Sequence, residues 1–179
     1  MEVSIRPFKD EDLETIVQLQ TLSLSQLPQQ FRKYDCQQID SLIEGQAAWR
    51  RMSFDFETIL IAEDNDRVPI GFIAIERFQI TGLFVHPDYL NLGVGSKLLK
   101  HIELLAVASR IKTLGVLSSL ESIDFYQKRE YQFVRETGFF SQGLIWIPCQ
   151  LLEKELIPAP PSENWEVKQL NWLCRWLFK

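Results

Sequence analysis

The pattern of apolar and polar positions is clearest in the middle of the chain, between residues 80 and 106. The apolar, partly β-branched run 81–85 predicts a strand, and His86 and Pro87 end it because proline cannot continue a paired ladder. From Ser96 onward apolar residues recur at helical spacing, which predicts an amphipathic helix. Its apolar face consists of Leu98, Leu99, Ile102, Leu105 and Ala106.

Strands and helices also follow from the pattern on both sides of this segment. Ahead of it we expect, in order, a strand at 3–7, helices at 10–28 and 37–51, and strands at 58–63 and 68–77. After it we expect a strand at 113–117, a short helix at 122–130, and a hairpin of strands at 131–140 and 144–152. Antiparallel neighbours followed by a strand–loop–helix unit indicate a mixed sheet of the α/β or α+β class.

The last part of the chain differs from the rest, so we expect one folded domain at 1–156. Residues 157–163 are rich in proline and predict a stiff, non-helical linker. Residues 164–179 predict an amphipathic helix with a narrow polar face and three tryptophans. Exposed tryptophan is unfavourable in water. We therefore expect this helix to pack back on the domain, to be buried in a homodimer, or to lie on a membrane surface, in that order of preference.

Composition narrows the classes of function. The net charge of -5 argues against a nucleic-acid partner, because phosphate binding needs a basic face. The 3 cysteines are far apart and lack a CxxC spacing, so we expect free thiols in a reducing compartment and no metal site. The first residues contain acids early, unlike a signal peptide, and no apolar run approaches the ~18 residues of a membrane span. The expected location is cytoplasmic.

Two glycines, Gly93 and Gly95, open the central helix and allow a tight turn close to a ligand. A helix start carries unpaired N–H groups and the positive end of the helix dipole, which suits a phosphate or pyrophosphate. The order Gly95-Ser96-Lys97 fails the P-loop pattern, and Leu98 replaces the third glycine of the dinucleotide-binding fingerprint. A strand-to-helix connection without a ligand is the alternative for these two glycines taken alone.

Two stretches resemble the GCN5-related N-acetyltransferase superfamily. The run Leu90-Asn91-Leu92-Gly93-Val94-Gly95 resembles the motif Gln/Arg-x-x-Gly-x-Gly/Ala, with Leu90 in place of Gln or Arg. Residues 119–131, SLESIDFYQKREY, resemble the motif that often contains Asn-Ala-x-x-Phe-Tyr-Glu-Lys-x-Gly-Phe. In that stretch the chain departs from the motif at Glu121, Ser122, Glu130 and Tyr131.

The resemblance implies a fold, a coenzyme and a set of contacts. The fold is a seven-stranded, mostly antiparallel sheet with flanking helices, covering residues 1–156. The co-substrate is acetyl-CoA, whose pyrophosphate is held largely by backbone N–H groups and whose pantetheine arm pairs with a splayed central strand. The implied coenzyme-binding residues are Leu83, Phe84, Val85, Leu90, Asn91, Leu92, Gly93, Val94, Gly95, Ser96 and Phe125.

Acetyl transfer to an amine requires a polarised carbonyl, a neutral amine and a protonated leaving thiolate. The resemblance implies a backbone N–H near Phe84 or Val85 for the carbonyl and Tyr126 as the general acid. Glu76 is our first choice for the base, ahead of Glu63 and His86, and a water chain could replace any of them. Three aromatic residues could line the acceptor pocket or simply belong to the core: Tyr34, Trp49 and Phe54.

The sequence therefore predicts an N-acetyltransferase that moves an acetyl group from acetyl-CoA to a primary amine, on a small molecule or a protein, by direct attack. The alternative is a non-catalytic module of the same fold that binds acyl-CoA or acts through its tail. Transfer of labelled acetyl groups to a panel of amines separates the two.

Overall fold

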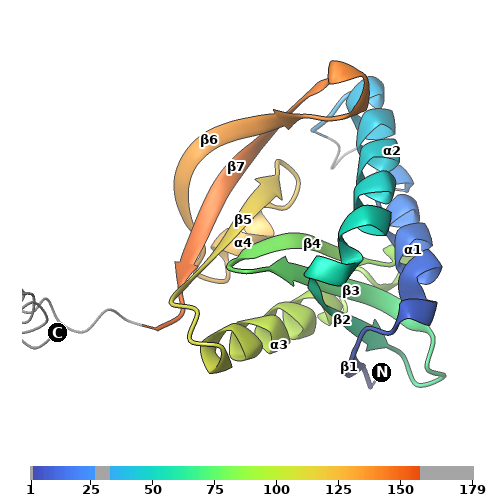
Figure 1. Cartoon of the computed structure of the whole chain (residues 1–179), viewed down its shortest axis with the longest axis vertical. Coiled ribbons are helices and arrows are strands. Elements are labelled where there is room, and N and C mark those ends of the chain that lie inside the picture. The colour runs from blue at the N-terminus through green and yellow to red at the C-terminus, as the bar shows by residue number, and fades with distance from the viewer. Residues whose placement is uncertain (1, 27–32, 158–179) are drawn as a thin grey trace, which may run out of the picture.

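A mixed sheet forms the centre of the protein. The computed structural model describes residues 2–26 and 33–157, and within them the sheet has seven strands in the order β1-β2-β3-β4-β5-β7-β6 (Figure 1). β4 and β5 pair in parallel and the other neighbours are antiparallel, which confirms the predicted fold class. The strands are β1 (Ser4–Pro7), β2 (Thr58–Glu63), β3 (Pro69–Glu76), β4 (Gln79–Val85), β5 (Thr113–Ser119), β6 (Gln132–Phe140) and β7 (Trp146–Glu155).

Helices cover both faces of the sheet. α1 (Leu13–Ser25) and α2 (Cys36–Ser53) lie on one side, and α3 (Val94–Ala108) lies on the other (Figure 1). A short helix, α4 (Ile123–Gln127), follows β5. Single 3-10 turns occur at 10–12, 54–56, 87–89 and 142–144.

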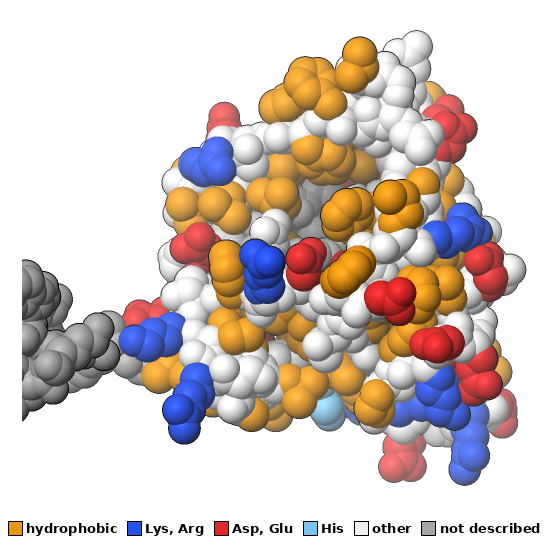
Figure 2. Space-filling model, viewed as in Figure 1, with side chains coloured by type: hydrophobic (Ala, Val, Ile, Leu, Met, Phe, Trp, Pro, Cys, Tyr) orange, Lys and Arg blue, Asp and Glu red, His pale blue; other side chains and the backbone are white. Residues whose placement is uncertain are grey.

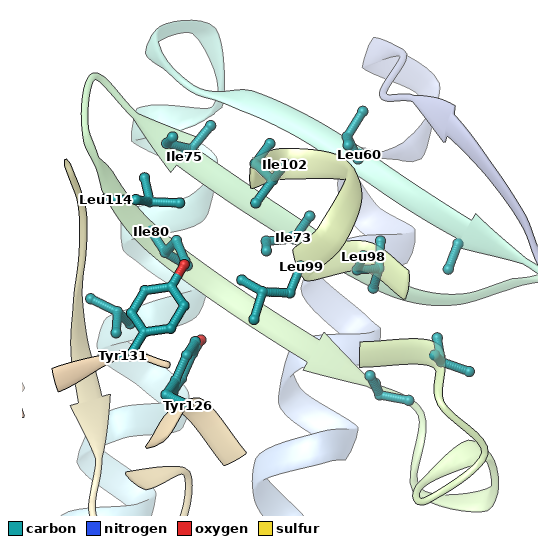
Figure 3. Packing of buried hydrophobic residues seen from close by; sticks show 14 of the residues in the cluster. Leu60, Ile73, Ile75, Ile80, Leu98, Leu99, Ile102, Leu114, Tyr126 and Tyr131 are labelled. Carbon is teal, nitrogen blue, oxygen red and sulfur yellow. The ribbon is translucent and has the colours of Figure 1, made fainter. Parts of the chain in front are cut away.

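The apolar stripes found in the sequence account for the two cores. Ile16 and Leu19 of α1 pack against the face of the sheet that carries Phe72. On the opposite face, α3 contributes Leu98, Leu99 and Ile102 to a larger cluster, which also contains Tyr126 and Tyr131 (Figure 3). Each side chain of this size stabilises the fold by about 1.5–3 kcal/mol when it is buried.

Two expectations at the helices were wrong in detail. Leu105 was expected on the buried face of α3, but it is 43% exposed, because the buried stripe is narrower than the run of apolar residues. The first α-helix begins at Leu13, not near Asp10, because the chain first makes a 3-10 turn. In that turn the carboxylate of Asp12 accepts hydrogen bonds from Arg6 at 2.7 and 2.8 Å.

The sheet opens between β4 and β5. These strands pair only at Gln79↔Gly115 and Ile80↔Val116, although each strand has 7 residues. The register between β3 and β4 also shifts, so that Thr81 has no partner in it. We call the opening beyond Ile80 the wedge, and we call the irregularity at Thr81 the β4 bulge.

Within the described residues no helix is both long and apolar enough to cross a bilayer. The linker and helix expected at 157–179 lie outside the described residues, except for Ile157.

Candidate coenzyme-binding and transfer site

The open edge of β4 carries backbone groups that point into the wedge. The N–H of His86 donates to the carbonyl of Ile70 on β3 at 2.8 Å. Backbone groups of successive residues point to opposite sides in an antiparallel ladder. The amides of Leu83 and Val85 therefore face the wedge, and that of Phe84 faces β3. Of the two residues expected to polarise a carbonyl, only Val85 presents its amide to the open side.

The loop between β4 and α3 exposes a row of amides. Asn91 and Gly93 adopt left-handed backbone conformations, with φ of 61° and 83°. The first helical hydrogen bond runs from the N–H of Lys97 to the carbonyl of Gly93 at 3.0 Å. Among the described residues, the amides of 91–96 have no hydrogen-bond acceptor. Such a concave row of amides at a helix start attracts anions.

The glycine turn and the second motif meet at one point. A Cβ on Gly95 would lie 3.4 Å from the ring of Phe125 and 3.6 Å from Val85, so these three residues are brought together as expected. At Gly93 a Cβ would meet nothing within 4 Å, which leaves the outer side of the loop open. Leu90 and Leu92 are exposed by 41% and 58% beside it, so Leu90 offers no polar group in place of the family's Gln or Arg.

One charged residue at this point was missed by the reading of the sequence. Arg129 donates hydrogen bonds to the hydroxyl of Ser96, in the first turn of α3, and to the carbonyl of Phe125 at 2.6 Å. Its guanidinium lies 3.8 Å from the centroid of the Phe125 ring. The motif places no fixed residue type at this position, so its pattern held no signal for Arg129.

Tyr126 is buried in the cluster on the α3 side of the sheet, near Tyr131 and Leu99 (Figure 3). Its ring makes edge contacts with Phe125 at 5.1 Å and with Tyr131 at 5.3 Å between centroids. Its hydroxyl makes no hydrogen bond with any described residue. Burial raises the pKa of Tyr126 well above its ordinary value, and the nearby charge of Arg129 only partly offsets this effect. Tyr126 therefore remains a protonated hydrogen-bond donor at neutral pH.

The three candidate bases lie in different places. Glu76 is half-buried at the end of β3, opposite Gln79, and therefore lies beside the closed end of the wedge. Glu63 is buried and is paired with Arg6 at 2.6 Å, on the β1 side of the sheet. His86 lies at the open end of the wedge, where its Nδ1 accepts a hydrogen bond from the N–H of Asp88 at 3.2 Å.

The face that carries α2 is hollowed. Figure 2 shows this hollow between α2 and the β6–β7 hairpin, with hydrophobic side chains around it. Trp49 on α2 is 49% exposed. Tyr34 is buried, and its hydroxyl donates to the carbonyl of Pro148 at 2.7 Å. Phe54 is half-buried and packs on Phe8, so these two aromatics belong to the core.

Glu121 has a contact of its own. Its carboxylate accepts a hydrogen bond from the N–H of Lys33 at 2.9 Å, which ties the start of α4 to the segment before α2.

Within 2–26 and 33–157, no group of three or more His, Cys, Asp or Glu side chains is placed to hold a metal ion. Cys36 and Cys149 are both free thiols.

Known proteins share the fold of this chain and part of its sequence pattern. Residues 55–133 match the family model described as "Acetyltransferase (GNAT) domain". A structure of a GCN5-related N-acetyltransferase from Rhodopseudomonas palustris matches with a TM-score of 0.78 and 26% identity, over 87% of this chain and 96% of that one. No curated protein sequence matches the chain.

Two structures that contain a coenzyme share the fold at lower identity. The PaiA N-acetyltransferase of Thermoplasma acidophilum, in complex with coenzyme A, has 22% identity and a TM-score of 0.64, over 87% of this chain and 99% of that one. YncA of Salmonella typhimurium, with its cofactor acetyl-CoA, has 14% identity and a TM-score of 0.63, over 92% and 99%.

The family model spans β2 to β5 together with the glycine turn, α3 and α4, and these include the elements that build the wedge and its loop. The remaining strands complete the same seven-stranded sheet. Residues 55–133 therefore match an acetyltransferase (GNAT) domain, and the chain shares the fold of a GCN5-related N-acetyltransferase.

Proposed function

We propose that the protein transfers an acetyl group from acetyl-CoA to a primary amine, on a small molecule or a protein, by direct attack. One observation carries this proposal: the free amides of 91–96 lie at the mouth of a wedge whose β4 edge is unpaired beyond Ile80. A diphosphate suits the first feature, and an extended arm with amide groups suits the second. Acetyl-CoA contains both groups. The family and the coenzyme seen in its relatives PaiA and YncA support the same choice.

In this proposal the diphosphate is bound by both the loop and Arg129. The loop supplies neutral N–H donors, and Arg129 supplies the positive charge that Leu90 cannot. Arginine binds phosphate through paired N–H groups of fixed geometry. The bond to Ser96 and the stacking on Phe125 hold the guanidinium beside the first turn of α3 before a ligand arrives.

Two groups then act on the thioester. The amide of Val85 faces the wedge and would donate to the carbonyl oxygen as it gains charge. Tyr126 would donate a hydrogen bond to the departing sulfur. A coenzyme thiol has a pKa of about 8.5, well below that of a buried phenol. Because burial raises the pKa of Tyr126, a shared hydrogen bond is a better description of this role than complete proton transfer.

In this scheme the amine enters from the hollowed face beside α2 and attacks the carbonyl carbon near Val85, so a base at the closed end of the wedge would take its proton through a chain of water molecules. Glu76 remains our first choice for the base, because it lies at that end and is only half-buried. Glu63 is committed to its ion pair with Arg6. His86 lies at the open end of the wedge next to Val85, but its Nδ1 already accepts a hydrogen bond from the N–H of Asp88.

The decisive experiment combines binding and transfer. A thermal melt with acetyl-CoA at ~100 times its dissociation constant should show stabilisation of about 2.7 kcal/mol. The same protein is then incubated with radiolabelled acetyl-CoA and a panel of small amines and amine-bearing peptides, and label on an amine supports the proposal. Adenosine and free pantetheine, which both lack the diphosphate, serve as controls for ligands that fill only part of the site.

The alternative function is a module that binds acyl-CoA without transfer. The hydrophobic Leu90 and the poor acidity of Tyr126 favour this alternative. Stabilisation by acetyl-CoA with no label on any amine would support it, and no stabilisation at all would contradict both functions.

A further inference from the structure

A charged pair lies buried behind the β4 bulge, on the face covered by α1 and α2. The side chains of Arg50 on α2 and Glu57 ahead of β2 are both 0% exposed and form an ion pair. Arg50 also lies 5.1 Å from the centroid of the Phe72 ring and donates weakly to Gln20 at 3.4 Å. Removing two charges from water is costly unless all their polar atoms find partners.

Several polar atoms of this region have no such partner. Among the described residues, four buried atoms at this place make no hydrogen bond: Arg50 Nη2, Ser53 Oγ, Glu57 Oε1 and Thr81 Oγ1. An unpaired buried polar group costs about 1–3 kcal/mol, so four of them together would be a heavy burden for a fold of this size.

Positions in the chain and two contacts link the residues that carry these four atoms. Ser53 follows Arg50 by three positions on α2 and therefore lies on the same side of the helix. Glu57 is bound directly to Arg50. A Cβ on Gly82 would lie 2.5 Å from Arg50 Nη2, so the guanidinium lies against the backbone of β4 beside Thr81. Thr81 is the residue that the register of β3 and β4 leaves without a partner.

We propose that Arg50, Ser53, Glu57 and Thr81 form an internal hydration site, in which shared water completes their hydrogen bonds and fixes the β4 bulge. The donors and acceptors suit water: Arg50 Nη2 donates, Glu57 Oε1 accepts, and the two hydroxyls do either. A buried water makes about three such bonds, so one or two molecules serve all four atoms.

The charges at the site favour water over an ion. Arg50 and Glu57 already neutralise each other, so a bound anion or cation would leave an uncompensated charge in an apolar interior. The guanidinium contacts Gln20, Glu57, Phe72 and the backbone at Gly82, and apart from Glu57 these neighbours carry no charge.

The proposed hydration site adjoins the part of β4 that faces the wedge. Thr81 is the first residue of β4 beyond its last pair with β5, and Leu83 and Val85 follow it along the wedge. Holding the bulge therefore sets the direction of the β4 amides that face the wedge. In this role Thr81 and Arg50 are positioning residues, and this second part of the proposal rests on the proposed function.

Stability tests the hydration site without any activity. Thr81→Val keeps the shape of the side chain and removes its hydroxyl, and Thr58→Val on the exposed side of β2 is the matched control. If water pairs the hydroxyl, Thr81→Val lowers Tm by about 3 °C relative to the control. If the hydroxyl is truly unpaired, the same change raises Tm, which would overturn the proposal.

A double-mutant cycle tests whether the water is shared. Ser53→Ala in the Thr81→Val background should cost clearly less than Ser53→Ala alone, because the common water has already been lost. Strictly additive losses would overturn a shared site. A crystal structure should also show density within hydrogen-bond distance of Thr81 Oγ1 and Arg50 Nη2, and a dry site there would contradict the proposal.

Kinetics test the positioning role separately. In a protein that transfers acetyl groups, Thr81→Val should lower kcat with little change in the KM for acetyl-CoA, and Thr81→Ser should restore it. An unchanged kcat beside a positive stability cycle would overturn the positioning role. Loss of all transfer in the wild type would instead indicate failure of the proposed function, because the stability cycle does not depend on it.

Discussion

Arg129 holds its guanidinium 3.8 Å from the centroid of the Phe125 ring, at the first turn of α3. This contact places a positive charge beside the loop that lacks the family's usual polar residue at Leu90. In the proposed function Arg129 supplies the polar, charged group that Leu90 does not.

We predict that Arg129→Leu weakens coenzyme A binding about tenfold, because one charge-assisted pair of hydrogen bonds is lost. Lys128→Leu, which removes a neighbouring exposed charge, is the matched control and should change the dissociation constant little. Calorimetric titration with coenzyme A measures both. Equal affinities for wild type and Arg129→Leu would exclude a phosphate contact for Arg129.

We predict that Tyr126→Phe lowers kcat on the order of 10²-fold while coenzyme binding remains intact. Tyr131→Phe, an adjacent buried tyrosine, should leave kcat nearly unchanged. Because burial raises the pKa of Tyr126, the wild-type rate should show no alkaline loss from this residue below about pH 10. A drop in kcat near pH 8 that disappears in Tyr126→Phe would show that the hydroxyl ionises there, contrary to this expectation.

Two glycines of the central strands should differ sharply in their tolerance of a methyl group. A Cβ on Gly82 would lie 2.5 Å from Arg50 Nη2, whereas a Cβ on Gly115 meets nothing closer than 3.8 Å. Gly82→Ala should therefore destabilise the fold by about 1–3 kcal/mol, because the guanidinium would have to shift and weaken its buried ion pair with Glu57. Gly115→Ala should be nearly neutral. Urea unfolding of both variants measures the difference, and similar midpoints would refute the close approach of Arg50.

The Arg6–Asp12 contact should make stability depend on pH at the acid end. Hydrogen bonds from Arg6 lower the pKa of Asp12 below its ordinary value, so the folded chain binds fewer protons there than the unfolded chain. This stabilisation is complete above about pH 4, the pKa of an unfolded aspartate, and is lost as the pH falls through the folded value.

Asp12→Asn should therefore lower Tm at pH 7 by about 3 °C and lower it progressively less as the pH falls below about 4. Asp10→Asn, an exposed neighbour, should have little effect at either pH. Melting curves between pH 3 and pH 7 provide the measurement. A deficit for Asp12→Asn that stays constant over this range would contradict the linkage.

The sequence was sufficient to predict the strands and the glycine turn that opens α3, because both depend on local patterns. The strand ended by His86 and Pro87, the turn at Gly93 and the helix that follows need only nearby residues. The match of Gly95 to Phe125 in space also followed, because the family's two motifs occur in a fixed order.

Long-range pairing explains what the sequence did not reveal. The sequence pattern places Arg50 at the polar end of a helix, where a surface charge is expected. Its side chain is instead wholly buried against Gly82 of β4, more than thirty positions later in the chain. Arg129 occupies a position that the motif leaves variable. The wedge itself depends on the point at which β4 and β5 stop pairing, and no residue type in the sequence indicates that point.

The two residue pairs that join β4 to β5 have a consequence for the lifetime of the protein in a cell. They leave the central sheet as two blocks with little backbone connection, so a bound acyl thioester that spans the gap would resist local opening and cleavage by proteases.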